Sequence, residues 1–510
     1  MNNLLQEGTA VGQPVAVVGA GTMGAGIAQV AALAGHRVKL LDLRPGAAQT
    51  AIDQIANSLA GLVDKGRLSA EDRSATLARL VEVKRLPDLA DAALVVEVIV
   101  EELSVKQTLV RELEGIVWSQ AVIASNTSSI SITAIANGMK HPQRLVGMHF
   151  FNPVPLMKLV EVVSGAETDP DVAQAVFDTA KRWGKTPVHA RSTPGFIVNR
   201  IARPFYAETL AMLQEQAAAP AVLDALARGA GFRMGPCELM DLIGHDVNFA
   251  VTTSVFNANF GDRRYAPSPV QRALLDGGRL GRKAGKGFYD GVPPGPAAAS
   301  AEPAPLPTSL ALAGAGPMAR ALSSWLTQRG LAFARDDTAP WTGLQLGDIE
   351  VHVTDGRTAM QLAAQRRYPQ LAVIDLLPAS DKLRAIGVAF ATSASGATRQ
   401  AVLGALQACG WQPQEMLDTP GLWAARTVCM LINEAADAVH QGVCDEGGAD
   451  LAMKLGTNWP VGPFEWLGLL GVDYTAAVLD NLHAGTRNER YRVSPLLQQR
   501  LWSERLAQHG

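Results

Sequence analysis

The sequence predicts an α/β fold that begins with a Rossmann-like, doubly wound parallel sheet and continues into an all-α domain. Two patterns indicate this. Short apolar runs alternate with helical patterns through residues 14–190, and helical periodicity with few strand signals follows from residue 191. Alternation of the first kind is typical of a parallel sheet with helices on both faces. A degenerate α/β segment and a second all-α copy are expected nearer the C-terminus.

The expected strands of the first domain are short and rich in branched apolar residues, as buried parallel strands are. They are Val15–Val18, Val38–Leu41, Leu94–Val98, Val122–Ser125 and Leu145–His149, with a further strand at Met157–Val163. Helical patterns lie at Pro45–Lys65, Ser69–Leu80 and Asp169–Trp183.

A glycine-rich turn joins the first strand to the first helix. Gly19 permits a tight turn, Gly21 lets the backbone approach a pyrophosphate, and Gly24 lets the helix pack closely on the strand. The helix N-terminus offers free N–H groups to phosphate. The full turn is Gly19, Ala20, Gly21, Thr22, Met23 and Gly24.

Asp42 ends the second strand, near the distance along the chain at which such folds place a ribose-binding acid. A carboxylate there accepts both hydroxyls of an adenosine ribose and repels a 2′-phosphate. The sequence therefore predicts NAD, rather than NADP, as the cofactor. The alternative is an ordinary tight turn between strand and helix.

The domain boundaries follow changes in composition. We expect an NAD-binding domain at 1–190, an all-α domain at 191–290, a Pro/Ala-rich linker at 291–308, a short degenerate Rossmann-like segment at 309–410 and a second all-α copy at 411–510.

An internal repeat supports the second copy. Thr419–Arg426 echoes Thr193–Arg200, and Val461–Glu465 echoes Met234–Glu238. The second copy has Ala425 where the first has Asn199, so we expect it to be non-catalytic.

Composition limits the function classes. The chain has 510 residues, a net charge of −3 and four cysteines without C-x-x-C spacing. This charge favours neither nucleic acid nor an anionic membrane as a partner. Residues 1–13 carry no segment of the signal-peptide type, and we expect a cytoplasmic protein with reduced thiols. Without an H-E-x-x-H or a His/Cys cluster, no metal site is expected.

Two residues near strand ends are candidates for acid–base chemistry. His149 lies at the end of an expected strand, on the ligand-facing edge of such a sheet, and Glu161 lies within an apolar run. A carboxylate that holds an imidazole fixes its tautomer and raises its basicity. The alternatives are a packing histidine and an edge-strand acid that faces water.

Four further polar residues have both functional and structural interpretations. Ser128 either hydrogen-bonds a substrate oxygen or caps a helix, and Asn199 either polarises a carbonyl or pairs within its helix. Glu101 and Lys106 either contact the nicotinamide ribose and the acyl carrier or form a solvated helix pair.

Together these motifs resemble the 3-hydroxyacyl-CoA dehydrogenase family over residues 14–290. The resemblance rests on their order: residues 19–24, Asp42, Glu101 with Lys106, 126–129, 149–153, 157–161 and 194–200. It implies NAD-dependent oxidation of a (3S)-3-hydroxyacyl-CoA to the 3-ketoacyl-CoA.

The resemblance also implies roles for individual residues. His149 is the base, Glu161 orients it, and Ser128 and Asn199 hold the 3-oxygen. Asn152 and Lys283 match cofactor-contacting positions, and Ser58 and Lys65 match positions that contact CoA.

The whole length is most similar to the long bacterial form of the family found in phenylacetate breakdown, which implies 3-hydroxyadipyl-CoA as substrate. The alternatives are 3-hydroxybutyryl-CoA, a dehydrogenase of the 6-phosphogluconate type, and a non-enzymatic NAD-binding relative. Because one-copy members dimerise through their α-domain, we expect the two α-copies to form an internal pseudo-dimer. A further homo-oligomer stays open.

Overall fold

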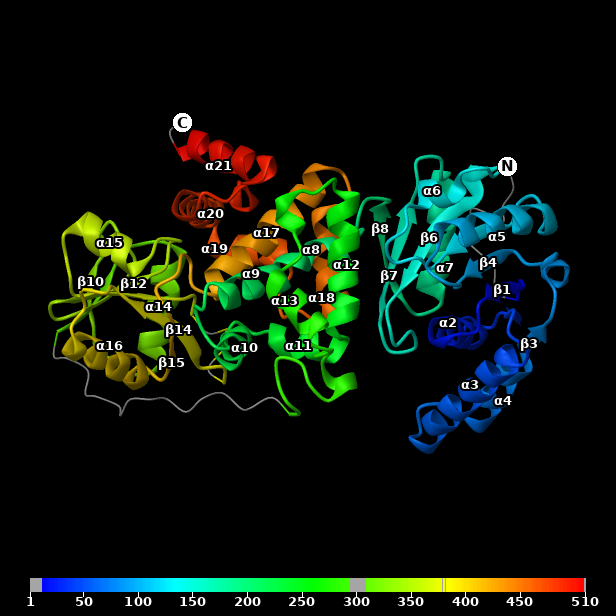
Figure 1. Cartoon of the computed structure of the whole chain (residues 1–510), viewed down its shortest axis with the longest axis horizontal. Coiled ribbons are helices and arrows are strands. Elements are labelled where there is room, and N and C mark those ends of the chain that lie inside the picture. Colours follow the sequence, from blue (N-terminus) through cyan, green and yellow to red (C-terminus); the bar gives the residue numbers. More distant parts are fainter. Residues whose placement is uncertain (1–11, 293–308, 378, 381, 509–510) are drawn as a thin grey trace. The chain divides into compact units, whose positions relative to one another are not determined.

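The computed structural model describes residues 12–292, 309–377, 379–380 and 382–508 (Figure 1). Residues 1–11 lie outside the described residues. So do residues 293–308 of the linker expected at 291–308. The chain forms two compact units. The N-terminal unit contains residues up to Val198 together with Gly442–Thr457, and the C-terminal unit contains Asn199–Gln441 and the residues from Asn458 on.

An eight-stranded sheet forms the centre of the N-terminal unit, in the order β3-β2-β1-β4-β5-β6-β7-β8. All neighbours are parallel except β6 and β7, which are antiparallel. The strands are β1 (Val15–Val18), β2 (Val38–Leu41), β3 (Leu80–Val83), β4 (Leu94–Glu97), β5 (Val122–Ser125), β6 (Leu145–Phe150), β7 (Leu159–Ser164) and β8 (Thr186–Arg191).

The helices at Thr22–Leu33, Ala47–Asp64 and Pro170–Arg182 bury their apolar faces against this sheet in one continuous core. α7 shows why a helix forms at its position: the Asp169 side chain caps its N-terminus, Pro170 begins it, and Lys181 and Arg182 lie in its last turn. The helices are α2 (Thr22–Leu33), α3 (Ala47–Asp64), α4 (Ala70–Ala78), α5 (Leu103–Ile116), α6 (Ile132–Ala136), α7 (Pro170–Arg182) and α18 (Glu446–Thr457).

The predicted Rossmann-like sheet and its six expected strands are confirmed, with two differences. The helix expected at Ser69–Leu80 ends at Ala78, because Leu80 already pairs with Val38 in β3. Neither β3 nor β8 was expected as a strand. The helix α18, from the region predicted as the second α-copy, groups with the N-terminal unit because it packs on β7 and β8.

The C-terminal unit contains a seven-stranded mixed sheet, in the order β10-β9-β11-β12-β13-β14-β15. Its strands are β9 (Leu310–Ala313), β10 (Ala334–Asp336), β11 (Gly343–Leu346), β12 (Ile349–Val353), β13 (Leu371–Ile374), β14 (Ala385–Phe390) and β15 (Gln412–Glu415). Three helices accompany the sheet: α14 (Pro317–Gln328), α15 (Ala359–Arg366) and α16 (Gly396–Ala408).

Part of this second sheet repeats the first. β12 to β15 pair as parallel, antiparallel and parallel, which is the pattern of β5 to β8. The rest of the second sheet does not repeat the first, because β9 and β11 are antiparallel. Pro317 begins the helix after the glycine turn and supplies no N–H, so this turn offers one donor fewer than the turn at residues 19–24.

Two sets of helices complete the C-terminal unit. The first is α8 (Val198–Ile201), whose first residue belongs to the N-terminal unit, α9 (Arg203–Gln214), α10 (Pro220–Gly229), α11 (Pro236–Ile243), α12 (His245–Ala258) and α13 (Pro269–Asp276). The second is α17 (Ala424–His440), α19 (Pro463–Leu470), α20 (Val472–Thr486) and α21 (Pro495–Gln508). The single-turn helices η3 (Arg263–Tyr265), η4 (Arg282–Ala284) and η5 (Glu489–Tyr491) lie in the loops.

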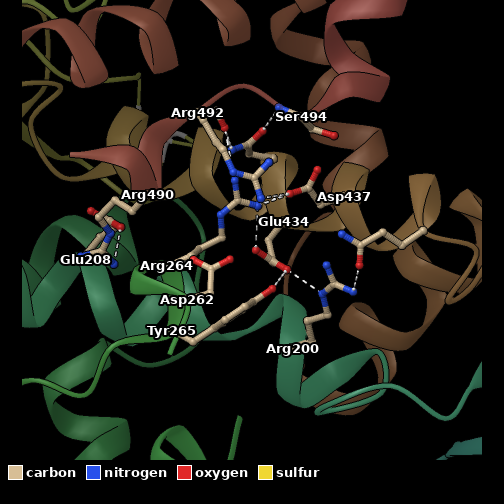
Figure 2. A network of polar contacts seen from close by, with 12 residues as sticks. Arg200, Glu208, Asp262, Arg264, Tyr265, Glu434, Asp437, Arg490, Arg492 and Ser494 are labelled. Atoms are coloured by element: carbon tan, nitrogen blue, oxygen red, sulfur yellow. Dashed lines mark hydrogen bonds and ion pairs between the residues drawn. The ribbon is translucent and has the colours of Figure 1, made fainter. Parts of the chain in front are cut away.

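The two helical sets meet along α9 and α17 through a reciprocal exchange of charges. Figure 2 shows one half of it: Glu434 of the second set accepts from Nε of Arg200 at 2.7 Å and from the Tyr265 hydroxyl at 2.6 Å.

In the other half, Glu208 of the first set accepts from Nε of Arg426 and from the Tyr491 hydroxyl, both at 2.8 Å. Glu208 and Glu434 are fully buried. The Arg, Glu and Tyr residues recur at the same spacing in both sets. The Arg and Tyr of each set donate hydrogen bonds to the Glu of the other set.

Candidate active site

His149 and Glu161 face each other across the antiparallel pair β6 and β7. Nδ1 of His149 lies 2.6 Å from Oε2 of Glu161. The other carboxylate oxygen, Oε1, accepts the backbone N–H groups of Ile197 at 3.0 Å and Val198 at 2.9 Å. Because both oxygens are engaged, the carboxylate is fixed, and it orients the ring so that Nε2 is the nitrogen left for a substrate.

The surroundings of this pair are apolar. His149 is 6 % exposed and Glu161 is fully buried. The rings of Phe151 and Phe196 lie with their centroids 4.5 and 5.9 Å from that of the imidazole. Low polarity strengthens the interaction between an imidazolium and its carboxylate.

Glu101 organises the loop after β5. Its Oε1 accepts the Thr127 hydroxyl at 2.7 Å and the N–H groups of Ser128 and Ser129 at 3.0 and 3.2 Å. Burial opposes the charge of Glu101, but the bond from Thr127 and the charge of Lys106 outweigh it and lower its pKa. Glu101 therefore places the Ser128 hydroxyl at the end of β5.

Lys106 is part of a buried cluster rather than a solvated helix pair. Its Nζ lies 2.6 Å from Glu97 and 3.3 Å from Glu101, and its side chain is 1 % exposed. Glu97 also accepts the Ser125 hydroxyl at 2.6 Å. The ammonium thus holds Glu101 in place, while its expected contact with a ligand stays a prediction.

Asn126 is a positioning residue that sequence reasoning missed, although it belongs to the 126–129 motif. Its Oδ1 accepts the N–H of Phe150 at 2.9 Å, which ties the end of β5 to the end of β6. This bond sets Ser128 and His149 on neighbouring strands of the same sheet edge. Asn152 follows β6 and is exposed.

A cavity of about 760 Å³ lies beside the glycine-rich turn. Gly19, Gly21 and Asp42 line it, together with apolar residues of α5 and of the segment that follows β4. A Cβ at Gly19 would overlap the carbonyl oxygen of Val98, and one at Gly24 would overlap that of Gly19. At Gly21 a Cβ would meet nothing within 4 Å. The residues therefore fit a dinucleotide, because the turn is tight where it must be and open where a phosphate would approach.

Asp42 lies on the wall of this cavity. Its Oδ2 accepts the N–H of Ala20 at 2.8 Å, which joins the end of β2 to the turn. The Arg44 guanidinium donates to both carboxylate oxygens at 3.0 Å and lowers the pKa of Asp42 to about 2. Arg44 is 71 % exposed in its side chain, so it can turn into water and leave Asp42 to a ribose.

The remaining candidates are more widely distributed. Ser58 is exposed on α3, and Lys65, also exposed, ends that helix. Lys283 lies in η4 of the C-terminal unit, where it pairs with Asp246 at 2.6 Å. Asn199 is the first residue of the C-terminal unit and directly follows Val198, whose N–H binds Glu161. Among the described residues, no cluster of three or more His, Cys, Asp or Glu is arranged to hold a metal ion. No described helix is long and apolar enough to span a bilayer.

Comparison with known proteins identifies the family. The profile for the NAD binding domain of 3-hydroxyacyl-CoA dehydrogenase matches residues 14–193, and the profile for its C-terminal domain matches both 195–291 and 421–509. The chain belongs to the 3-hydroxyacyl-CoA dehydrogenase family. It is an NAD-dependent oxidoreductase. A profile for a 3-hydroxybutyryl-CoA dehydrogenase reduced Rossmann-fold domain matches residues 351–420.

Some relatives match this chain over nearly its whole length, and others over about half of it. A protein of Escherichia coli K12 named 3-hydroxyadipyl-CoA dehydrogenase is 45 % identical over 96 % of this chain and 97 % of its own. A crystal structure of an E. coli K12 3-hydroxybutyryl-CoA dehydrogenase, 43 % identical, covers 96 % of this chain and 98 % of its own with a TM-score of 0.88. The 3-hydroxybutyryl-CoA dehydrogenase of Clostridioides difficile is 39 % identical and matches 54 % of this chain with 98 % of its own.

Proposed function

We propose that this dehydrogenase oxidises 3-hydroxyadipyl-CoA to 3-oxoadipyl-CoA with NAD⁺, in phenylacetate breakdown. The observation that supports the reaction is the contact between His149 and Glu161. The backbone N–H groups of Ile197 and Val198, just before Asn199 in the chain, hold the Glu161 carboxylate in place. The name and full-length similarity of the E. coli relative support the substrate.

In the proposed mechanism, Nε2 of His149 accepts the proton of the 3-hydroxyl. Glu161 stabilises the imidazolium that forms, because Nδ1 lies 2.6 Å from its carboxylate. Ser128 and Asn199 hold the substrate oxygen. NAD⁺, when bound by the turn at 19–24 and by Asp42, supplies the acceptor for the hydride of C3. Further cofactor contacts are proposed for Asn152 and Lys283, and CoA contacts for Ser58 and Lys65.

The alternative substrate is 3-hydroxybutyryl-CoA, which several relatives of shorter length carry in their names. A non-enzymatic NAD-binding role is less well supported. A protein that only binds NAD has no use for a buried histidine whose free nitrogen is set by a fixed carboxylate.

A substrate panel tests the proposal. Formation of NADH is followed with 3-hydroxyadipyl-CoA, 3-hydroxybutyryl-CoA and the corresponding free acids. We expect kcat/KM for the adipyl substrate to exceed that for the butyryl substrate by at least ~10-fold, which is the effect of one additional hydrogen bond to a charged group. A higher value for the butyryl substrate would establish the alternative, and no NADH with any thioester would refute the activity itself.

We also propose the domain organisation set out above, with the helical copies at 191–290 and 411–510 acting as an internal pseudo-dimer. The reciprocal exchange at Glu208 and Glu434 supports it, since self-complementary contacts are typical of two-fold interfaces. The C. difficile relative also supports it, because 98 % of that protein matches only 54 % of this chain. A protein that ends at residue 292 should therefore self-associate in light scattering, and a stable monomer would contradict the pairing.

A cytoplasmic location is part of the same proposal. Cys237, Cys409, Cys429 and Cys444 are free thiols, which is typical of reducing compartments. Cell fractionation, with an antibody against the chain, tests it.

A further inference from the structure

Arg203 begins α9, four positions after Asn199. Ala202, which joins α8 to α9, has right-handed helical dihedral angles of φ −74° and ψ −14°. Side chains four residues apart on a helical turn lie on the same face, with Cβ atoms about 5–6 Å apart. Arg203 therefore stands one turn beyond the residue proposed to hold the 3-oxygen of the substrate.

Arg203 is a buried cation without a carboxylate partner among the described residues. It is 6 % exposed. Its Nη1 donates to the Thr252 hydroxyl at 3.1 Å, its guanidinium lies 4.9 Å from the Tyr206 ring centroid, and its buried Nε has no partner. Burial lowers its pKa. Buried charges in proteins are ordinarily paired or bind a ligand, so this one lacks its anion.

The neighbouring arginines differ in this respect. Arg264 pairs with Asp437, and Arg490 lies 3.0 Å from Glu208 (Figure 2). Both belong to the exchange between the helical sets. Of the buried arginines that line a common pocket in the described part of the chain, Arg203 is thus the one without a carboxylate partner.

Arg203 lines a pocket of about 270 Å³ that lies wholly within the C-terminal unit. Tyr206, Leu210 and Gln214 of α9 continue its wall along the same helix face, and Thr252 and Tyr265 close it from other elements. The pocket therefore joins an unpaired guanidinium to a partly apolar wall, which suits a short chain that ends in an acid.

We propose that Arg203 binds the distal carboxylate of a dicarboxylic 3-hydroxyacyl-CoA and so selects this class of substrate. The inference rests on the proposed function, in which Asn199 holds the oxygen on C3. In an adipyl chain the carboxylate carbon is three bonds beyond C3, which matches one helical turn. A guanidinium binds a carboxylate through two parallel N–H···O bonds, and a single ammonium cannot reproduce this.

Binding of unreactive thioesters tests the assignment apart from catalysis. Adipyl-CoA and hexanoyl-CoA share the CoA and the chain length but differ in the terminal carboxylate. Calorimetry on the full-length protein should show adipyl-CoA bound about 30-fold more tightly, the scale of a charge-assisted pair. Arg203→Met should reduce this ratio to below about 3, and Arg203→Lys should leave an intermediate ratio.

Arg272→Met is the matched control, because Arg272 is an exposed arginine of α13 in an ion pair with Asp276. This variant should keep the full ratio. If Arg203→Met does not fold, Arg203→Lys decides, and an unchanged ratio there overturns the proposal.

The outcomes separate the inference from the function on which it rests. A preference for adipyl-CoA that survives Arg203→Met overturns the assignment, as does a wild-type protein without any preference. Oxidation of 3-hydroxybutyryl-CoA, measured in parallel, shows whether the dehydrogenase activity stands on its own. If Arg203→Met loses the preference for adipyl-CoA and Arg272→Met keeps it, Arg203 is established as the carboxylate-binding residue.

Discussion

Asp375 occupies in the second sheet the place that His149 has in the first. His149 lies on β6 opposite Glu161 of the antiparallel neighbour, and Asp375 directly follows β13, with its N–H bonded to Gly387 of the antiparallel neighbour β14. Gly387 has no side chain, so Asp375 reaches the start of α17 itself. It accepts the N–H groups of Trp423 and Ala424, at the repeat positions of Ile197 and Val198. The imidazole and its carboxylate have been replaced by a single capping carboxylate.

This replacement leads us to predict one active site per chain. His149→Ala should lower kcat by at least ~10², the usual scale of general acid–base help, because the second copy offers no base in its stead. NADH binding, followed by fluorescence, should be unchanged. His189→Ala, in which an exposed histidine of β8 stacked on Phe177 is removed, is the control. Near-normal turnover of His149→Ala would refute the assignment.

Asp375 should also make stability depend on pH. Burial raises its pKa to about 6, despite the backbone N–H groups that favour its charged form. The folded state then holds a proton that the unfolded chain loses near pH 4, so the free energy of unfolding falls as the pH rises from about 4 to 6. Asp375→Asn should remove about 3 kcal/mol of this change. Urea unfolding at several pH values measures it, and equal pH slopes for both proteins would contradict it.

Asp42 should decide between NAD and NADP. Its charge opposes a 2′-phosphate, whereas Arg44, now bonded to it, would attract one. Asp42→Ala alone should therefore raise kcat/KM for NADP relative to NAD by about 10-fold or more, an effect of one charged contact. The ratio of the two kcat/KM values measures it. Asp53→Ala, on the exposed face of α3, is the control, and an unchanged ratio in Asp42→Ala would exclude this role.

Glu434 should be essential to stability. Glu434→Gln leaves Arg200 and Arg264 buried without this carboxylate, and breaking a buried pair costs about 3–5 kcal/mol. Asp276→Asn, which breaks the exposed pair with Arg272, should cost less than about 1 kcal/mol. Urea midpoints of the two variants give the comparison. A loss of equal size in both would show that the exchange between helical sets contributes little.

Local patterns were sufficient to predict the first sheet, the glycine-rich turn and the residues 149 and 161. Apolar runs specify buried strands through side-chain burial alone, and a G-x-G-x-x-G turn specifies backbone room at fixed positions. The edge strands β3 and β8 were missed. Leu80–Val83 is mostly half-buried and Thr186–Arg191 mixes buried with exposed residues, and both become strands through pairing with β2 and β7.

The sequence by itself determined the family and the glycine-rich turn, and it singled out His149 and Glu161 as a pair, because each depends on residue type and order along the chain. Only the tertiary structure decided that Lys106 is buried between Glu97 and Glu101, and that Arg203 has no carboxylate beside it among the residues described. It also decided that Arg200 meets Glu434, far along the chain. These facts depend on which distant surfaces pack together, and packing, not spacing, sets the partner and the burial of a charged side chain.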